Sequence, residues 1–326
     1  MDLLRDADID PAPLTGKRVA IIGFGNQGRA QALNLHDGGI DVVVGLRPGS
    51  PSAAEVERTG IAHLPPAEAA AGADLVMLLA PDETLAEIYA ELEPQLPQGS
   101  ALGLSHGLAI RFGLIQPRAD LDVIMVAPKG PGTALRSLYV EGSGMIALWA
   151  VAQDTSGSAR GLALAYGAAI GCARAGIIAS TFAEECDADL FNEAAVVWGA
   201  VPEILIAGFD TLVAGGISPE VAYMECVGEL KLLAELIDAR GIAGMREAIS
   251  NTAELGATLG GPRIVDEAVR ERMTETLGSI RSGQFAEQLA REYREGYPRL
   301  KAARRRARDS GVERAGAEIA ALNSSR

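Results

Sequence analysis

The sequence predicts two domains of different classes, an α/β domain with a parallel sheet followed by a domain made only of helices. Short runs rich in Val, Ile and Leu alternate with helical stretches through the first half of the chain, which is typical of a sheet covered by helices on both faces. A glycine-rich turn follows the first of these runs. After about Ile178 the strand pattern stops and long helical stretches follow.

Each element of this prediction rests on a run of the sequence. The predicted strands cover 18–23, 40–45, 74–80, 101–105, 122–126 and 145–151. The predicted helices of the second half cover 187–201, 203–215, 218–240, 243–255, 263–281 and 284–308. The change of pattern near residues 175–185 places the predicted domains at 1–182 and 183–326.

Composition and charge argue against several classes of function. The 326 residues are 48% hydrophobic, and 29 basic against 43 acidic residues give a formal net charge of −14, which disfavours a nucleic-acid or anionic membrane surface. The three cysteines are widely spaced without a CxxC pair, and the longest uncharged runs, such as 161–173, are shorter than a membrane span. With an acidic N-terminus that has no secretory apolar region, these features predict a soluble protein of the reducing cytoplasm.

The glycine-rich turn has the spacing GxGxxG between a predicted strand and a predicted helix. The first glycine permits a tight turn, the second lets the backbone approach a pyrophosphate, and the third allows close packing of helix against strand. The helix N-terminus then offers free N–H groups to the phosphates. This context predicts a Rossmann-type dinucleotide site, with a glycine-rich turn that binds nothing as the alternative. The residues of the turn are Gly23, Phe24, Gly25, Asn26, Gln27 and Gly28.

The end of the second predicted strand favours NADP over NAD. An NAD site usually has Asp or Glu there to bind the ribose 2′-hydroxyl, whereas this chain continues with Arg47, Ser50 and Ser52. The arginine supplies charge and the serines supply hydrogen-bond donors to a 2′-phosphate. The alternative is that Arg47 only caps a surface loop.

Two pairs of acids point to a metal. Asp189 and Glu193, and likewise Glu225 and Glu229, are spaced i,i+4 in apolar sequence, within a stretch from Ala175 to Leu230 that contains no Lys or Arg. Like charges at this spacing repel on one helix face, so partly buried carboxylates need a cation or must take up protons. Oxygen ligands without clustered His or Cys suit Mg²⁺, and two such pairs match a two-metal site. The alternative for each pair alone is a solvated acidic face.

Three further polar residues are candidates because of their positions. His106 follows a predicted strand directly, and Lys129 lies on a Pro/Gly turn after another, at the strand ends where open α/β sheets bind ligands. Either side chain could instead be an ordinary loop residue. Ser250 is a predicted helix N-cap with Glu254 nearby.

Taken together, the chain resembles the ketol-acid reductoisomerases of branched-chain amino-acid biosynthesis, in their short-chain class I form. The resemblance extends from about Leu14 to Tyr293. The blocks that carry it are GFGNQGRAQALNL, VVVGLRPGS, DVIMVAPKGPG, RAGIIASTFAEE, DLFNE, AGFDTLVAGG, AYMECVGELKL and ISNTAELG.

The resemblance implies a function for the acids and the polar candidates. Asp189 would bridge two Mg²⁺ ions and Glu193 would bind the first, while Glu225 and Glu229 would form the second pair, supplied by a partner subunit. The implied catalytic residues are His106, Lys129 and Glu229, and the implied substrate contacts are Ser250, Glu229 and Asp189. Further implied cofactor contacts are Pro81, Asp82, His106 and Gly132.

The resemblance also implies the reaction and the assembly. The expected activity is Mg²⁺-dependent alkyl migration in 2-acetolactate or 2-aceto-2-hydroxybutyrate, followed by NADPH reduction to a 2,3-dihydroxy acid, in valine and isoleucine biosynthesis. The implied fold is a Rossmann domain followed by a knotted helical domain, in a homodimer or higher homo-oligomer whose subunits share the active site.

Several positions depart from the family pattern and keep alternatives open. Ser105 stands in place of Ala or Gly, Asn192 in place of Gly, Gly228 in place of His, and Arg29 in place of His. A related enzyme for a different 2-hydroxy-3-keto acid is therefore one alternative. A metal-free β-hydroxyacid dehydrogenase and a non-catalytic NADP-binding protein are the others.

Overall fold

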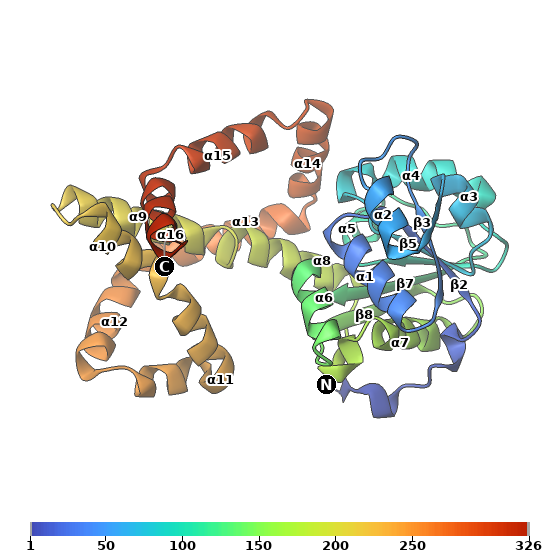
Figure 1. The fold of residues 1–326 in the computed structure, drawn as a ribbon, viewed down its shortest axis with the longest axis horizontal. Helices are drawn as coiled ribbons and strands as arrows, with labels where there is room; N and C mark the ends of the chain where they lie inside the picture. Colours follow the sequence, from blue (N-terminus) through green and yellow to red (C-terminus); the bar gives the residue numbers. More distant parts are fainter. Residues whose placement is uncertain (1, 325–326) are drawn as a thin grey trace. The chain divides into compact units, whose positions relative to one another are not determined.

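The computed structural model describes residues 2–324. The chain divides into two compact units, one that ends at Ala188 and one that begins at Asp189 (Figure 1). The division falls inside helix α8 (Phe182–Phe191), which therefore belongs to both units. Each unit is described by itself below.

The first unit is built on one sheet, which has nine strands among the described residues. Its order is β1-β9-β8-β7-β6-β5-β2-β3-β4. The strands are β1 (Leu3–Leu4), β2 (Arg18–Ile22), β3 (Asp41–Gly45), β4 (Ala62–Leu64), β5 (Leu75–Leu78), β6 (Ala101–Leu104), β7 (Asp122–Pro128), β8 (Ala147–Gln153) and β9 (Ile177–Ala179). The six predicted strands are all present, with bounds within two residues of the prediction, while β1, β4 and β9 were not predicted.

The prediction of a parallel sheet is wrong at two places. Strand β8 runs antiparallel to β7, and β1 runs antiparallel to β9. The reason for the first lies in the connection, because the chain re-enters the sheet at the end it left. Pro128 of β7 lies opposite Ala147 of β8, and the Lys129 N–H donates to the Ile146 carbonyl oxygen at 2.9 Å. The remaining strand pairs are parallel. They run in the order β7-β6-β5-β2-β3-β4, with β8 and β9 as a further pair.

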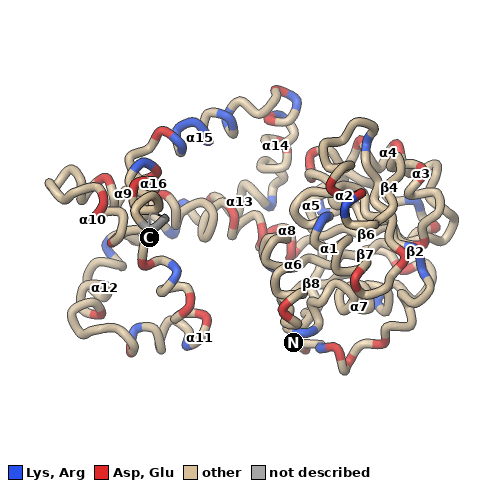
Figure 2. Tube along the Cα trace, viewed as in Figure 1, with Lys and Arg blue, Asp and Glu red and all other residues tan. Residues whose placement is uncertain are grey.

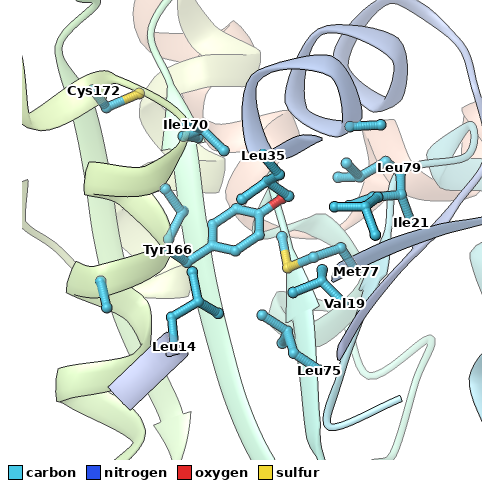
Figure 3. Close-up of a cluster of buried hydrophobic side chains, with 14 of the residues drawn as sticks. Leu14, Val19, Ile21, Leu35, Leu75, Met77, Leu79, Tyr166, Ile170 and Cys172 are labelled. Atoms are coloured by element: carbon cyan, nitrogen blue, oxygen red, sulfur yellow. The ribbon is translucent and has the colours of Figure 1, made fainter. Parts of the chain in front are cut away.

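Helices cover both faces of this sheet (Figure 1). Alternate residues of β2 enter different apolar clusters, Val19 and Ile21 on one face and Ala20 and Ile22 on the other, as the two-residue period of a strand requires. The first cluster includes Tyr166, whose ring lies among aliphatic side chains in Figure 3. The helices are α1 (Asn26–Asp37), α2 (Ala53–Thr59), α3 (Pro66–Ala71), α4 (Leu85–Leu92), α5 (Leu108–Arg111), α6 (Gly132–Val140) and α7 (Ala159–Ala169).

The second unit is helical throughout its described residues. It follows α8 with α9 (Ala200–Ala214), α10 (Pro219–Tyr223), α11 (Leu230–Ala248), α12 (Asn251–Ile264), α13 (Glu267–Arg281), α14 (Gln284–Arg294), α15 (Pro298–Arg308) and α16 (Gly311–Ser324). Two π-helical turns interrupt the predicted helices 187–201 and 218–240, namely η6 (Asn192–Val196) and η7 (Met224–Gly228). Each lies at one of the acid pairs, where π-helical turns are often associated with function.

Other predicted helix bounds in this unit are also wrong. The predicted helix 243–255 is split, because Ser250 caps the start of α12 with its hydroxyl oxygen, which accepts from the Ala253 N–H at 3.2 Å. The predicted helix 284–308 is split by Tyr297, which has a φ of 61°, followed by Pro298 at the first position of α15.

The second unit buries little apolar surface within one chain. Its buried cluster consists of Phe209, Ala222, Val312 and Ala315. Trp198, Leu232 and Leu259 are 62%, 59% and 64% exposed. A unit of this length normally needs a much larger core, so its apolar side chains are available for burial against another surface.

One helical stretch in the described residues is long and apolar enough to cross a membrane by length and composition alone. It covers Phe182–Ala214, with a mean hydropathy of 1.6 and 6% of the apolar window buried. The sequence prediction missed it because it considered only uncharged runs. A single stretch of this kind is weak evidence for a membrane span, and this one carries Asp189 and Glu193.

Candidate active site

Only glycine fits the backbone at two positions where β2 leads into α1. Gly23 has a φ of 101°, and a Cβ there would lie 2.8 Å from the Leu79 carbonyl oxygen. A Cβ on Gly28 would collide with the carbonyl oxygen of Gly23. A Cβ on Gly25 would meet no atom within 4 Å, so the backbone is open to a ligand where α1 begins.

The next two residues of this turn bind a neighbouring turn of the chain. The Gln27 side-chain amide donates to the Gly130 carbonyl oxygen at 2.8 Å, and the Asn26 side-chain oxygen accepts from the Thr133 N–H at 3.0 Å. A Cβ on Gly132 would collide with the Asn26 backbone. The glycine-rich turn and the turn after β7 are therefore fixed to each other.

The loop between β3 and α2 contains the predicted NADP residues. Arg47 is exposed, and its carbonyl oxygen accepts from the Ser50 N–H at 3.0 Å. The Ser50 hydroxyl in turn accepts from the Ser52 N–H at 3.3 Å. Just beyond the loop, Glu55 forms an ion pair of 2.6 Å with Arg29 of α1, so the nearest acid is matched by a cation.

His106 lies at the carboxyl end of β6, where its ring contacts a carboxylate. Its Nδ1 is 3.0 Å from Asp82, in the short helix η3 (Asp82–Thr84) that follows β5 and Pro81. Burial opposes the charged ring, but hydrogen bonds to Asp82 and Cys186 outweigh it and raise the pKa of His106 to about 11. The ring is therefore a hydrogen-bond donor at neutral pH.

Glu185 is a buried acid of the candidate site that the sequence reasoning did not single out. It is 1% exposed, and its two carboxylate oxygens accept from the Lys129 ammonium at 3.1 Å and from the Gly107 N–H at 2.8 Å. The signal was present, because Glu185 precedes Asp189 by the same four residues that separate Asp189 from Glu193. Glu185 thus joins the turn after β7 to the turn after β6.

The stretch from Ala175 to Leu230 contains no Lys or Arg, but the expectation that its acids have no cationic partners is wrong for Glu185 and Asp187. Figure 2 shows α8 and α9 without Lys or Arg, as the sequence requires. Cations nevertheless come from distant parts of the chain, because Lys129 pairs with Glu185, and Arg111 pairs with Asp187 at 3.3 Å. Separation in sequence therefore says little about charge pairing in the fold.

One group of potential metal ligands is gathered among the described residues. His106, Glu185 and Asp189 offer ligand atoms that lie within 4.8 Å of one another, with Asp189 placed one turn after Glu185 by α8. The Nδ1 of His106 is already hydrogen-bonded to Asp82, and the carboxylates of Glu185 and Asp189 are the oxygen ligands that this group offers. Their oxygen atoms fit a hard divalent cation.

The other predicted ligands lie outside this group within the described residues. Glu193 lies in the π-helical turn η6, Glu225 lies in η7, and Glu229 separates η7 from α11. Ser250 is the N-cap of α12, as predicted. None of these four side chains belongs to the group of ligand atoms around Glu185.

Comparison with known proteins identifies both parts of the chain. Residues 13–176 match the family described as acetohydroxy acid isomeroreductase, NADPH-binding domain, and residues 182–325 match the family described as ketol-acid reductoisomerase, C-terminal domain. An NADH-preferring ketol-acid reductoisomerase from an uncultured archean is 44% identical, with 99% of each chain covered and a TM-score of 0.95.

More distant solved structures share the fold alone. A semialdehyde dehydrogenase NAD-binding protein from Cupriavidus necator is 20% identical, over 82% of this chain and 99% of that one, with a TM-score of 0.62. A pyrroline carboxylate reductase from Plasmodium falciparum is 13% identical, over 84% and 98% of the two chains, with a TM-score of 0.53. The two family matches and the 44% identity over the full length show that this chain belongs to the ketol-acid reductoisomerase family.

Proposed function

We propose that this reductoisomerase converts 2-acetolactate, or its ethyl homologue, to a 2,3-dihydroxy acid with NADPH and Mg²⁺, in valine and isoleucine biosynthesis. The observation that carries the proposal is the arrangement around Glu185. Lys129, the backbone of Gly107 and the ligand atoms of His106 and Asp189 all lie around this carboxylate, at the strand ends beside the glycine-rich turn. Strand ends of this kind are where α/β sheets bind cofactor and substrate together.

The choice of NADPH rests on the loop after β3. No Asp or Glu lies between Gly45 and Ser52, so this stretch has no carboxylate to bind a ribose 2′-hydroxyl. Arg47 is exposed there and can pair with a 2′-phosphate. The relative at 44% identity prefers NADH, so the comparison with NADH is part of the test.

The chain's own residues suit the handling of protons and charge. The Lys129 ammonium, held by Glu185, can donate a hydrogen bond to a substrate oxygen while its charge stays matched. His106, protonated and hydrogen-bonded to Asp82 and Cys186, supplies positive charge close to where negative charge develops during hydride transfer. We assign proton transfer in the isomerisation to Glu229.

The carboxylates suit divalent cations. Asp189 and Glu193, with Glu225 and Glu229 from a second subunit, are the proposed ligands of two Mg²⁺ ions. When bound, the ions supply Lewis-acid polarisation of the substrate ketone and hydroxyl oxygens. Support comes from the oxygen donors of Glu185 and Asp189, which lie within reach of one another on α8.

A second copy of this chain is the proposed partner, in a homodimer or higher homo-oligomer with a shared active site and a knotted helical domain. The second unit exposes large apolar side chains such as Trp198 and buries a cluster of only four residues among those described. A second copy would cover this apolar surface, including the stretch Phe182–Ala214, without a membrane. Light scattering of the purified protein tests this, and a monomer would contradict it.

One departure from the family pattern, Ser105, gives little support to a different substrate. The Ser105 hydroxyl accepts a hydrogen bond from the Gln31 side chain at 3.0 Å, so its contact is with a buried residue of the protein itself. The experiment that tests the proposal is NADPH oxidation with 2-acetolactate, repeated with a bulkier 2-hydroxy-3-keto acid. Higher kcat/KM with the bulkier substrate would favour a related enzyme of another pathway.

A further inference from the structure

The side chain of Gln31 lies at the centre of a buried hydrogen-bond network beneath the candidate active site. Its amide nitrogen donates to the Gln27 side-chain oxygen at 3.0 Å and to the Ser105 hydroxyl at 3.0 Å. Its amide oxygen accepts from the Tyr166 hydroxyl at 2.7 Å. Gln27 extends the network to the Gly130 carbonyl oxygen at 2.8 Å. Both amide N–H groups and the oxygen of Gln31 are thus engaged, which fixes the orientation of the amide.

The centre of the network is inaccessible to water, while Gln27 and Ser105 at its ends are partly buried. Gln31 and Tyr166 are both 0% exposed. Figure 3 shows the Tyr166 ring within the apolar cluster, with its hydroxyl oxygen directed to the side where Leu35 lies on α1. Burial raises the pKa of Tyr166 well above its ordinary value, so the hydroxyl keeps its proton and remains a donor. Buried polar groups in such surroundings are costly unless every one is satisfied, so this network is rigid.

The hydrogen bonds join the three turns from which the site is built. Gln27 belongs to the glycine-rich turn, Ser105 directly precedes His106, and Gly130 directly follows Lys129. Each turn leaves a different strand, namely β2, β6 and β7. Helix α7 contributes Tyr166 to this network, and its hydroxyl holds the side-chain amide of Gln31 on α1.

We propose that Gln31 and Tyr166 are positioning residues that set the cofactor turn, His106 and Lys129 at fixed distances from one another. They touch neither cofactor nor substrate and act through the turns. Hydride transfer depends steeply on geometry, and a misplacement of about 1 Å can cost on the order of 100-fold in rate. The inference rests on the proposed function, since it needs a cofactor at the glycine-rich turn.

A matched control exists on the same pair of helices. Asn34 lies three residues after Gln31 on α1, is also 0% exposed, and donates to the Ile170 carbonyl oxygen at the end of α7 at 3.0 Å. Its side-chain oxygen accepts from Arg136 at 2.9 Å. Asn34 therefore ties α1 to α7 as Tyr166 does, but none of its hydrogen bonds reaches the three turns.

The test compares Tyr166→Phe with Asn34→Leu in the full-length protein. Thermal unfolding, nicotinamide cofactor affinity by fluorescence titration and kcat are measured for both, at a temperature where both are folded. Tyr166→Phe is expected to weaken cofactor binding about three- to tenfold, as the loss of one buried hydrogen bond predicts, and to lower kcat by about tenfold. Asn34→Leu is expected to lower the unfolding temperature by at least as much while cofactor affinity and kcat stay within about twofold of wild type.

A third variant separates the branches of the network. Ser105→Ala removes only the hydrogen bond to the turn that carries His106, so it is expected to weaken cofactor binding less than Tyr166→Phe does while it still lowers kcat. If Tyr166→Phe matches Asn34→Leu in cofactor affinity and kcat, the residues are structural only and the proposal is wrong. Wild-type protein that binds neither NADPH nor NADH would instead contradict the proposed function, independently of any variant.

Discussion

Glu185→Gln is the substitution that most directly tests the account of the active site. The wild-type side chain uses one carboxylate oxygen for the Lys129 ammonium and the other for the Gly107 N–H. A glutamine keeps the shape but replaces one oxygen with an amide group, so it cannot accept both hydrogen bonds in this geometry. The substitution therefore removes either the contact with Lys129 or the contact with Gly107, together with the negative charge.

The structure sets the expected size of the effect. Hydrogen bonds to charged groups contribute about 1.5–3 kcal/mol, and breaking a fully buried ion pair costs about 3–5 kcal/mol. Because Lys129 is 33% exposed, water can solvate part of the released ammonium, so the lower range applies. A loss of about 2 kcal/mol corresponds to a fall of roughly 4–8 °C in the unfolding temperature of a unit this size.

The assay is thermal unfolding followed by circular dichroism, with Glu184→Gln as the control. Glu184 is the neighbouring residue on α8, is exposed, and accepts a hydrogen bond from the Ser180 hydroxyl at 2.9 Å. Its substitution is expected to change stability by less than about 0.5 kcal/mol. Equal unfolding temperatures for the two variants would show that the buried ion pair does not hold the turns together.

Three further predictions concern the cofactor turn and its surroundings. Arg29→Gln is expected to weaken NADPH binding severalfold more than NADH binding, because it leaves the Glu55 carboxylate without its cation beside the loop between β3 and α2. Adding Glu55→Gln should restore NADPH binding, and equal effects on both cofactors in titrations would contradict this prediction. The raised pKa of His106 contributes stability that is complete below about pH 6.5 and is lost as the pH rises toward 11. Asp82→Asn should therefore flatten the fall in unfolding temperature between pH 7 and 10. An unchanged slope of unfolding temperature against pH would refute this prediction. Gly28→Ala is expected to destabilise the first unit by about 1–3 kcal/mol in urea unfolding, because the new Cβ collides with the Gly23 carbonyl oxygen; a stability equal to wild type would contradict that geometry.

The sequence predicts the elements of the first unit well and their directions less well. The short apolar runs of β5 and β6 favour buried strands, and the glycine spacing indicates the turn before α1. Nothing in the run that forms β8 indicates its direction, which follows from where α6 returns the chain to the sheet. The strand β4 has three residues of mixed polarity, so it gives no periodic signal.

The candidate site is only partly visible in the sequence. Spacing singles out Asp189 and Glu193, but the π-helical turns η6 and η7 depart from the α-helical period on which that reasoning depends. The pairing of Glu185 with Lys129 joins residues 56 positions apart, which no local pattern predicts. The hydroxyl of Ser105, a departure from the family pattern, is directed at Gln31, which only the fold shows.

The measurement that tests the central claim most directly is the oxidation of NADPH by the purified protein with 2-acetolactate, with Mg²⁺ present and then removed by EDTA. The account predicts turnover with Mg²⁺, loss of turnover with EDTA, and recovery when Mg²⁺ is added back. It also predicts a higher kcat/KM with NADPH than with NADH. Turnover that persists undiminished in EDTA would contradict the assignment of the carboxylates of α8 to a metal site.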